Sequence, residues 1–447
     1  MRTDFSPAQL NDRHIAASEK ILRSCVHCGF CTATCPTYLL LGDELDSPRG
    51  RIYLIKDMLE NDRPASPEVV KHVDRCLSCL SCMTTCPSGV HYMHLVDHAR
   101  AHIEKTHRRS LADRLMRQLL AAVLPYPERF RLALAAAFLA RPLRHMLGLI
   151  PSMGPRLSAM LALAPARFPA REVQIARSLL DQPNPKQNQR ACVVILDGCA
   201  QPVLKPSINQ AARRLLARAG VECVEAKGEG CCGALVHHMG KEAQSLAFAK
   251  ANIDAWIAQM EGQGLDAILV TTSGCGTNIK DYGHMLRDDP LYADKARRVS
   301  AITLDISQFL ARLDWRPSRT IADLPIAYHS ACSLQHGQQV RDEPKRLLAS
   351  AGFRVMDVPE AHICCGSAGV YNIMQPEIAG RLRARKVANI ERMKPRLIAA
   401  GNIGCMTQIG SATPLPLIHT IELLDWADGG PLPQDLTDRG FSDSDLR

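Results

Sequence analysis

The chain has 447 residues, of which 46% are hydrophobic and 22% are charged, a balance that excludes a disordered chain and allows a sizeable core. The net charge of +9 is too small to indicate nucleic-acid binding by itself. The unusual feature is the 18 cysteines. Because the first residues lack the apolar stretch of a secretory signal peptide, we expect a cytoplasmic protein whose reduced cysteines bind metal.

Two copies of a four-cysteine motif lie within the first 110 residues. In each copy three cysteines are spaced by two residues, and a fourth follows after three more residues and precedes a proline. This run holds two [4Fe–4S] clusters in bacterial ferredoxins, where the fourth cysteine of each copy reaches the other cluster. We therefore predict one cluster on Cys25, Cys28, Cys31 and Cys86, and a second on Cys76, Cys79, Cys82 and Cys35. Two zinc sites are the alternative, which this spacing disfavours.

A helix is predicted between the two motifs, with Ser47 as its cap and Pro48 at its first position. Arg49 and Arg51 lie in its first turn. They either offset the charge of a cluster, contact a partner, or belong to a solvated helix start. We assign residues 1–110 to a dicluster ferredoxin-type domain that is mainly helical.

The region 111–190 is rich in arginine and proline. Between Arg108 and Arg177 there are twelve arginines, seven prolines, three acidic residues and no lysine. This composition predicts short, broken amphipathic helices. One interpretation is an element that docks on a membrane surface or a partner. We favour a helical layer packed on the ferredoxin domain with its arginines in water, because the prolines interrupt any continuous amphipathic face.

The second half of the chain is an internal duplication. The segment Arg214–Gly220 resembles Arg346–Gly352, and each precedes a short β-like run and a vicinal cysteine pair followed by glycine. The repeat period of about 130 residues indicates two homologous domains, 191–320 and 321–447, rather than a solenoid. The recurring cysteines are Cys199, Cys231, Cys232 and Cys275 in the first domain, and Cys332, Cys364, Cys365 and Cys405 in the second.

Buried strands and helices alternate in both repeats. Strands are predicted at Val193–Leu196, Ala267–Val270, Ile326–Tyr328 and Leu397–Ile403, with helices such as Pro206–Ala219 and Lys241–Met260 between them. The predicted fold class is therefore a multidomain α+β and α/β protein, with mostly parallel sheets in the two repeats. Most of the recurring cysteines fall just after strands, so each set of four converges at the carboxyl ends of its sheet. We expect a further iron–sulfur cluster in at least one repeat; a metal-free scaffold, zinc or a disulfide are the alternatives.

Several other residues receive plainer interpretations. Cys192 and Cys223 lie in predicted strands and are expected to be inert core residues. His237, His238 and His329 are auxiliary ligands or proton relays, or else hydrogen-bonded polar groups, which we favour. The segment Gly228–Gly233 matches a dinucleotide fingerprint, but vicinal cysteines fill its variable positions, so we predict no flavin or NAD on this chain. The acidic tail after Asp425 is predicted to be flexible, and no segment is predicted to span a membrane.

The complete pattern resembles the iron–sulfur subunits of glycolate oxidase, a glycolate dehydrogenase, over roughly residues 15 to 425. Its most specific stretches are Cys25–Tyr38, Asp46–Ile52 and Ser273–Gly276. By this resemblance the two repeats are identified as CCG domains, named after their Cys-Cys-Gly motif. It implies that flavin-containing partner subunits oxidise glycolate to glyoxylate and that this chain, without turnover of its own, passes the electrons toward a membrane quinone pool. A location on the inner face of the cell membrane follows from the same resemblance.

Related layouts leave alternatives open. A similar arrangement occurs in iron–sulfur subunits of lactate utilisation and anaerobic glycerol-3-phosphate dehydrogenases, and in heterodisulfide reductase. In the last, a fifth cysteine completes each CCG motif, whereas this chain has Asn278 and Gln408 at those positions. That departure disfavours heterodisulfide chemistry. A third alternative is a scaffold that binds a membrane through Arg108–Arg177 and carries vestigial CCG cysteines.

Overall fold

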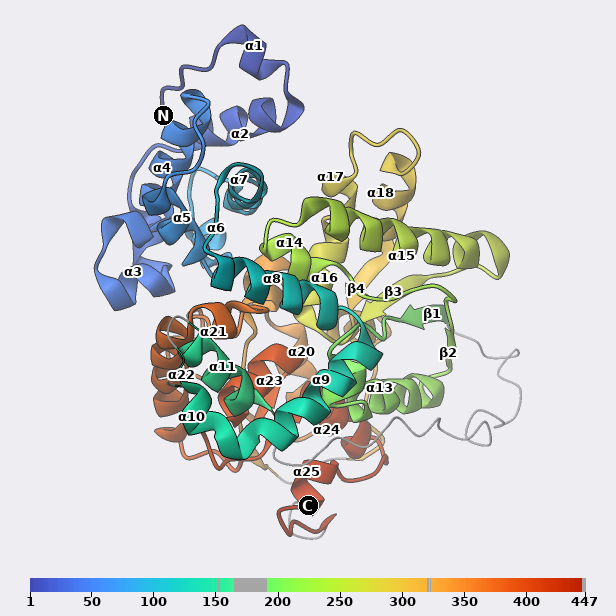
Figure 1. Cartoon of the computed structure of the whole chain (residues 1–447). Helices are drawn as coiled ribbons and strands as arrows, with labels where there is room; N and C mark the ends of the chain where they lie inside the picture. The colour runs from blue at the N-terminus through green and yellow to red at the C-terminus, as the bar shows by residue number, and fades with distance from the viewer. Residues whose placement is uncertain (149, 151–152, 165–190, 320, 322, 444–447) are drawn as a thin grey trace.

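The computed structural model describes residues 1–148, 150, 153–164, 191–319, 321 and 323–443. Helices form the first 164 residues, and two four-stranded sheets flanked by helices follow (Figure 1). The ferredoxin domain lies at the upper left of that view, with the N-terminus, and the C-terminus lies at the opposite end of the molecule. This is the predicted order of a helical domain and two α/β repeats.

The ferredoxin domain is a small helical body around a buried core that includes Leu22, Ile55 and Leu95. As predicted, Ser47 begins the inter-motif helix, since its hydroxyl accepts a hydrogen bond from the Gly50 amide. The elements are α1 Pro7–Leu10, α2 Arg13–Ser24, η1 Phe30–Thr34, α3 Pro36–Leu41, η2 Glu44–Asp46, α4 Pro48–Glu60, α5 Pro67–Asp74, α6 Ser81–Thr85 and α7 Tyr92–Thr106.

The arginine-rich region begins as a helical layer: α8 Leu111–Val123, α9 Pro127–Ala140, η3 Arg141–Leu143, α10 Arg144–Gly148 and α11 Gly154–Leu163. The layer does lie against the ferredoxin domain, as expected, since Arg109 and Arg117 pair with Asp74 of α5; these two arginines therefore do not face water, which corrects the other half of the expectation. Met116 and Leu120 of α8 also pack against Val236 and Val370 of the two CCG domains, in one buried hydrophobic cluster. Arg117 is buried and ion-paired. Residues 165–190 of the predicted region lie outside the described residues.

The first CCG domain contains a fully parallel sheet of strand order β2-β1-β3-β4. Its elements are β1 Ala191–Ile195, α12 Gln201–Leu204, α13 Ser207–Arg218, β2 Val221–Val224, α14 Ala234–His238, α15 Glu242–Gly262, β3 Ala267–Val270, α16 Ser273–Lys280, α17 Tyr282–Met285, α18 Ala293–Ile302, β4 Thr303–Asp305 and α19 Ile306–Arg312. The apolar runs of β1 and β3 are buried on both faces, as is typical of parallel strands.

The second CCG domain repeats the topology, with parallel strands in the order β6-β5-β7-β8. Its elements are β5 Pro325–His329, the π-helical turn η6 Ser333–Gly337, α20 Glu343–Ser350, β6 Arg354–Asp357, α21 Tyr371–Met374, α22 Pro376–Glu391, β7 Leu397–Ala400, α23 Ile403–Gly410, β8 Leu417–His419, α24 Thr420–Ala427 and α25 Gln434–Thr437. The strand predicted at Leu397–Ile403 is too long, because Asn402 caps a helix that begins at Ile403.

One hydrophobic core crosses from the first sheet to the second, so the two CCG domains form a continuous body. The tail is part of it. Leu436 is fully buried, Lys205 of the first domain pairs with Asp435, and Trp426 donates to Asp443. The acidic composition on which we based a flexible tail therefore did not prevent packing up to that residue.

Candidate metal centres

The eight ferredoxin cysteines gather in two groups around two cavities. One cavity is lined by Cys25, Cys28, Cys31 and Cys86. The other is lined by Cys35, Cys76, Cys79 and Cys82. These are the two crossed sets predicted from the sequence, although Cys82 also borders the first cavity. Four thiols around one hollow are the donor set that a [4Fe–4S] cluster requires, so the residues present fit two such clusters.

The two cysteine loops adopt the same strained backbone. His27 and Gly29 of the first loop have φ values of 56° and 86°, and Ser78 and Leu80 of the second have 49° and 62°. Residues other than glycine rarely occupy this left-handed region, which costs on the order of 1 kcal/mol or more per residue. The matching turns direct three sulfurs of each loop toward a common point, and strain of this kind is typical of ligand sites.

A buried arginine lies beside the second group. Arg51 is 1% exposed, its guanidinium lies 3.8 Å from the Cys35 sulfur, and it pairs with the buried Asp46. The Tyr92 hydroxyl donates to the Cys76 sulfur at 3.7 Å. Burial also raises the pKa of the Cys79 thiol well above its usual value. A nearby cation and hydrogen-bond donors offset that cost when the sulfurs are thiolate ligands.

The four recurring cysteines of the first CCG domain also converge. Hydrogen bonds from Cys199 and Cys232 lower the pKa of Cys231 to about 4, and the sulfur of Cys232 in turn contacts that of Cys275. The Gly233 amide donates to the Cys231 sulfur at 3.4 Å. At the position of a fifth cysteine, Asn278 donates to the Cys232 carbonyl at 2.7 Å instead. The site therefore holds four thiols and no fifth.

The second CCG domain has an equivalent set with one addition. The Cys332 and Cys364 sulfurs are 3.7 Å apart, and Cys365 contacts Cys405. In addition, one ligand atom each from His329, Cys365 and Cys405 lie within 4.8 Å of one another, and all three residues are buried. Burial lowers the pKa of His329 to about 3. The sequence left two roles open for His329, an auxiliary ligand or proton relay and a hydrogen-bonded polar group; we favoured the second, but its Nε2 atom has no hydrogen-bond partner among the described residues.

The second ferredoxin loop packs directly on the second CCG site. Leu77 and Cys79 belong to the same buried hydrophobic cluster as Cys364 and Tyr371. The Tyr371 hydroxyl donates to the Arg75 carbonyl at 3.0 Å. These contacts bring a cysteine of the second ferredoxin group into the same packed cluster as a cysteine of the second CCG group.

The two CCG sites meet through a polar seam that the sequence did not indicate. The hydroxyls of Ser273 and Ser333 are 2.7 Å apart, and Asn402 donates to Ser273 at 2.8 Å. Each residue lies within three positions of a recurring cysteine: Cys275, Cys332 and Cys405. The seam therefore joins the helix starts that carry cysteines of both domains.

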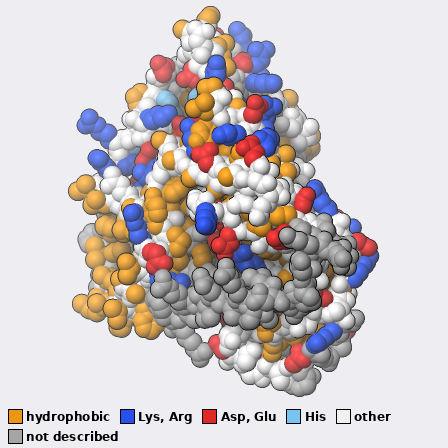
Figure 2. Space-filling view, turned by 90° about the vertical axis from the view of Figure 1, so that its right-hand side faces the viewer, with side chains coloured by type: hydrophobic (Ala, Val, Ile, Leu, Met, Phe, Trp, Pro, Cys, Tyr) orange, Lys and Arg blue, Asp and Glu red, His pale blue; other side chains and the backbone are white. Residues whose placement is uncertain are grey.

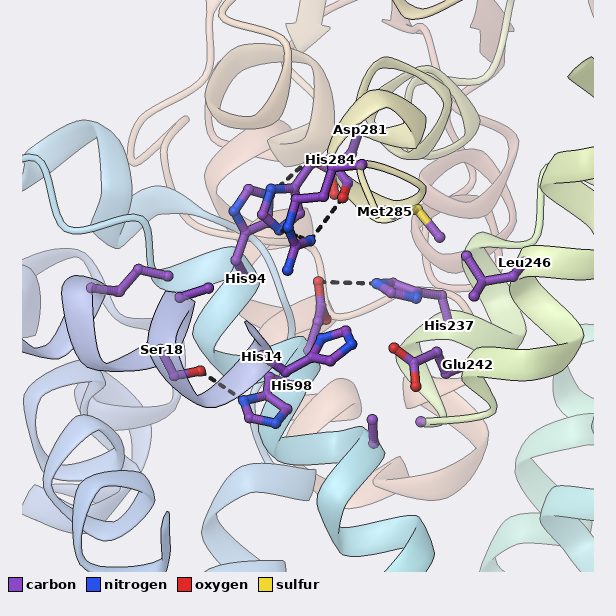
Figure 3. Close-up of a pocket in the computed structure, with 16 residues that line it drawn as sticks. His14, Ser18, His94, His98, His237, Glu242, Leu246, Asp281, His284 and Met285 are labelled. Atoms are coloured by element: carbon purple, nitrogen blue, oxygen red, sulfur yellow. Dashed lines mark hydrogen bonds and ion pairs between the residues drawn. The ribbon is translucent and has the colours of Figure 1, made fainter. Parts of the chain in front are cut away.

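The first CCG domain contacts the ferredoxin domain across a cavity lined by five histidines: His14, His94, His98, His237 and His284 (Figure 3). Their rings come from α2, α7, α14 and α17. The rings of His94 and His284 stack with centroids 3.4 Å apart, and His94 bonds Asp281 at 2.8 Å. His237 lies 3.2 Å from the buried Asp97. The sequence singled out His237 alone among these five and gave no signal for the cluster, because its members come from four separate elements.

The remaining candidate residues lie where a structural role accounts for them. Cys192 and Cys223 lie in β1 and β2, and burial raises the pKa of Cys223 to about 12, in keeping with an inert core residue. The Gly228–Gly233 segment is followed by a helix of only five residues, and its Gly230 amide already donates to Asn252. Among the described residues, no helix is both long and apolar enough to cross a bilayer.

Comparisons with known families agree with this division. The 4Fe-4S dicluster domain family matches residues 21–90, and the cysteine-rich domain family matches residues 193–280 and 326–410. The chain is 41% identical to the glycolate oxidase iron-sulfur subunit of Escherichia coli (strain K12), over 96% of this chain and 99% of that protein. It is 30% identical to the probable glycolate oxidase iron-sulfur subunit of Bacillus subtilis (strain 168), over 91% of this chain and 94% of that protein.

Two further matches are more distant. Lactate utilization protein A of Geobacillus thermodenitrificans (strain NG80-2) is 27% identical and aligns with 51% of this chain and 95% of its own length. A crystal structure of a hypothetical protein from Helicobacter pylori superposes with a TM-score of 0.54 at 10% identity, over 95% of this chain and 74% of that one. This last likeness concerns the fold alone.

Proposed function

Because the chain belongs to the family of glycolate oxidase iron–sulfur subunits, we propose that it carries electrons from a flavin-containing partner to a membrane quinone. Oxidation of glycolate to glyoxylate on the partner releases two electrons and two protons. The electrons pass through this chain, and a quinone takes up two electrons and two protons to become a quinol. This chain has no substrate turnover of its own in the proposal. It is a subunit of an oxidoreductase complex.

Two [4Fe–4S] clusters are the cofactors we propose, on the two crossed cysteine groups. Cys25, Cys28, Cys31 and Cys86 hold the first, and Cys35, Cys76, Cys79 and Cys82 hold the second. When bound, such clusters accept and release one electron at a time. Arg51 and Tyr92 tune the second cluster by charge and by a hydrogen bond to its sulfur ligands.

The observation that carries the proposal is the shared hydrophobic cluster of Cys79 and Cys364. A relay needs successive redox centres close to one another, and a packed protein interior between them keeps their separation fixed. The second ferredoxin group meets the second CCG group in this way, and the Ser273–Ser333 seam continues to the first CCG group. We propose that electrons follow this route, with at least one further iron–sulfur centre on the CCG cysteines.

The substrate proposal rests on the relatives at 41% and 30% identity. Lactate is the alternative, favoured only by a match to half of this chain at 27% identity. The test is reconstitution: this chain, purified without oxygen, is added to the flavin subunits, and glycolate-dependent and lactate-dependent reduction of a quinone analogue are measured. Glycolate turnover is expected, with loss in Cys79→Ser. Equal quinone reduction without this chain would contradict the relay.

We further propose that α8, α9 and α10 contact the bilayer that holds the quinone. Fifteen large hydrophobic side chains are exposed in the described chain, and nine of them lie between Leu111 and Ile150. On α8 the row Leu111, Leu115 and Leu119 faces outward at four-residue spacing, opposite the buried Met116. Hydrophobic side chains gather along the left edge of Figure 2, the side toward which the front of Figure 1 has turned.

The positive charge near this apolar face favours an anionic lipid surface as its binding partner. Four exposed arginines flank the apolar row: Arg108, Arg114, Arg129 and Arg141. Among the described residues none of them forms an ion pair; Arg129 donates to the Ala122 carbonyl and lies over the Tyr126 ring. An apolar face bordered by unpaired arginines is typical of helices that lie on anionic membranes.

Vesicle co-sedimentation tests this contact. The isolated chain is expected to bind vesicles that contain anionic phospholipid and to release at high salt. The triple variant L111Q/L115Q/L119Q should lose binding, whereas Leu291→Gln, an equally exposed leucine (75%) on the first CCG domain, should retain it. Binding that is absent from the natural chain, or unchanged in the triple variant, contradicts the membrane contact and leaves the relay untouched.

A further inference from the structure

The two CCG sites differ at the residue that lies three positions before their first recurring cysteine. His329 is the last residue of β5, three residues before Cys332. The matching residue of the first domain, three before Cys199, is Leu196, an apolar side chain that packs in the core. The duplication therefore places an imidazole at one site and a hydrocarbon at the other. Since the surrounding sheet is the same in both domains, the difference belongs to the site and not to the fold.

The His329 ring is buried with an unused nitrogen. The residue is 2% exposed, and its Nε2 atom has no hydrogen-bond partner within the described structure. Two other buried histidines of this domain are fully engaged. Both ring nitrogens of His336 bond Thr84 and the His362 carbonyl, and both of His419 bond backbone groups. A buried polar atom without a hydrogen-bond partner is destabilising, so the Nε2 atom of His329 lacks a partner of the kind that the other two histidines have.

The unused nitrogen belongs to a ring that faces two sulfurs. The ligand atoms of His329, Cys365 and Cys405 all lie within 4.8 Å of one another. Zinc–sulfur bonds of about 2.3 Å and zinc–nitrogen bonds of about 2.0 Å hold ligand atoms roughly 3.5 Å apart, so small side-chain adjustments close such a site. The three residues come from the end of β5, the loop before α21 and the start of α23, so three separate segments of the domain converge on this place.

From this geometry we propose that His329 is a nitrogen ligand of a metal centre in the second CCG domain, beside the thiolates of Cys365 and Cys405. Thiolate and imidazole together suit zinc and iron, and the remaining sulfurs of the site, Cys332 and Cys364, complete either coordination. The proposal deepens the proposed function by making one CCG centre chemically different from the other. The ligation does not depend on the identity of the substrate.

A buried lysine supports an anionic centre at this place. Lys386 is 2% exposed, and its ammonium donates to the Glu360 carbonyl at 2.8 Å. Burial lowers the pKa of this ammonium, and the nearby thiols of Cys365 and Cys364 and the Glu360 carboxylate, which Arg385 already binds, oppose that shift. A buried ammonium needs a nearby anion, and metal-bound thiolates supply one.

A second group of three metal-ligating side chains offers a contrast. Asp43, Asp46 and His72 also lie close together. There, however, the Asp46 carboxylate already accepts hydrogen bonds from Arg51 and Arg75, so its charge is neutralised without a metal. By contrast, no described residue bonds to the Nε2 atom of His329.

The experiment compares His329→Gln with His419→Gln, a histidine of equal burial whose nitrogens are both engaged. Iron and zinc per chain, and the rate of metal release to a chelator, are measured on full-length protein purified without oxygen. We expect His329→Gln to lose the iron or zinc of this one centre, or to release it at least about tenfold faster, while the eight ferredoxin ligands keep their iron. His419→Gln should match the natural chain.

A measurement on the natural chain covers the case in which His329→Gln does not fold. Labelling with ¹⁵N-histidine should change the nitrogen coupling in pulsed paramagnetic resonance if the centre contains iron. If it contains zinc, absorption at the zinc edge should show imidazole scattering. Full metal content with unchanged release in His329→Gln, or no histidine nitrogen at the metal, overturns the proposal. Neither result would contradict the proposed relay, which is tested by quinone reduction in the reconstituted complex.

Discussion

At the scale of single residues, Arg51 shows how a charge is placed for a metal centre. Its guanidinium reaches the Cys35 sulfur and the Asp46 carboxylate from a position that is 1% exposed. The sequence left open whether Arg49 or Arg51 faces a cluster. The structure gives each a different place. Arg49 is partly exposed, pairs with Glu44 and borders the cavity of the first cysteine group, whereas Arg51 is buried beside Cys35 of the second group.

Replacement of Arg51 by methionine should destabilise the chain and lower the reduction potential of the second cluster. The variant removes one partner of a buried ion pair, which typically costs about 3–5 kcal/mol. We expect the lower end, since Asp46 keeps Arg75 and His72. Thermal unfolding and redox titration under anaerobic conditions measure both effects. Arg49→Met is the matched control and should change neither quantity; equal behaviour of the two variants would contradict this role.

At the scale of elements, the glycine after each vicinal cysteine pair sets the turn that presents the sulfurs. Gly366 has a φ of +89°, and an added Cβ would lie 2.7 Å from the Ala379 carbonyl of α22. Gly233 has the equivalent conformation, with φ of +84° and the Ser245 carbonyl 3.0 Å from an added Cβ. The repeated glycine is therefore required by backbone conformation and by the close approach of a helix.

Gly366→Ala should cost about 1–3 kcal/mol and weaken metal binding at the second CCG site, because the turn must shift. Gly380→Ala is the control within α22. An added Cβ meets nothing within 4 Å there, so the exchange should stabilise the helix by up to about 1 kcal/mol. Denaturant unfolding and iron content check both variants. A Gly366→Ala chain as stable as the natural one would show that the turn tolerates a side chain.

At the scale of the whole molecule, the histidine-lined junction makes the contact between the ferredoxin domain and the first CCG domain sensitive to acid. Burial lowers the pKa of His98 and of His238 to about 4, and that of His284 to about 3. His237 is the exception: burial disfavours its charge, but Asp97 raises its pKa. Three imidazoles are thus held neutral at the junction by packing.

Because the folded pKa of these three groups lies below the unfolded value of about 6.5, their contribution to stability is complete above that pH and is lost as the pH falls toward 4. We expect the melting temperature and the protection of the junction from proteolysis to fall between about pH 6.5 and pH 5. His284→Phe, which keeps a ring against His94, should flatten the decline. An unchanged slope in this variant would assign the decline to other groups.

From the amino-acid sequence we could predict the ferredoxin cysteine sets, the duplication, the parallel sheets and the eight CCG cysteines. Spacing and periodicity are local properties, and a cysteine turn or a buried parallel strand carries its signal within a few residues. It missed β4 and β8, which have three residues each and too little length for a pattern.

Three findings needed the folded chain: where the α8–α11 layer packs, which CCG site meets the second ferredoxin loop, and that the Nε2 atom of His329 has no hydrogen-bond partner among the described residues. The buried position of Lys386 and the gathering of the five junction histidines also could not be predicted from the sequence. Each of these features depends on residues that lie far apart in the chain. Whether a side chain is buried, and whether it finds a hydrogen-bond partner, is decided by the residues that pack around it. A lone histidine or lysine in a sequence carries no information about either.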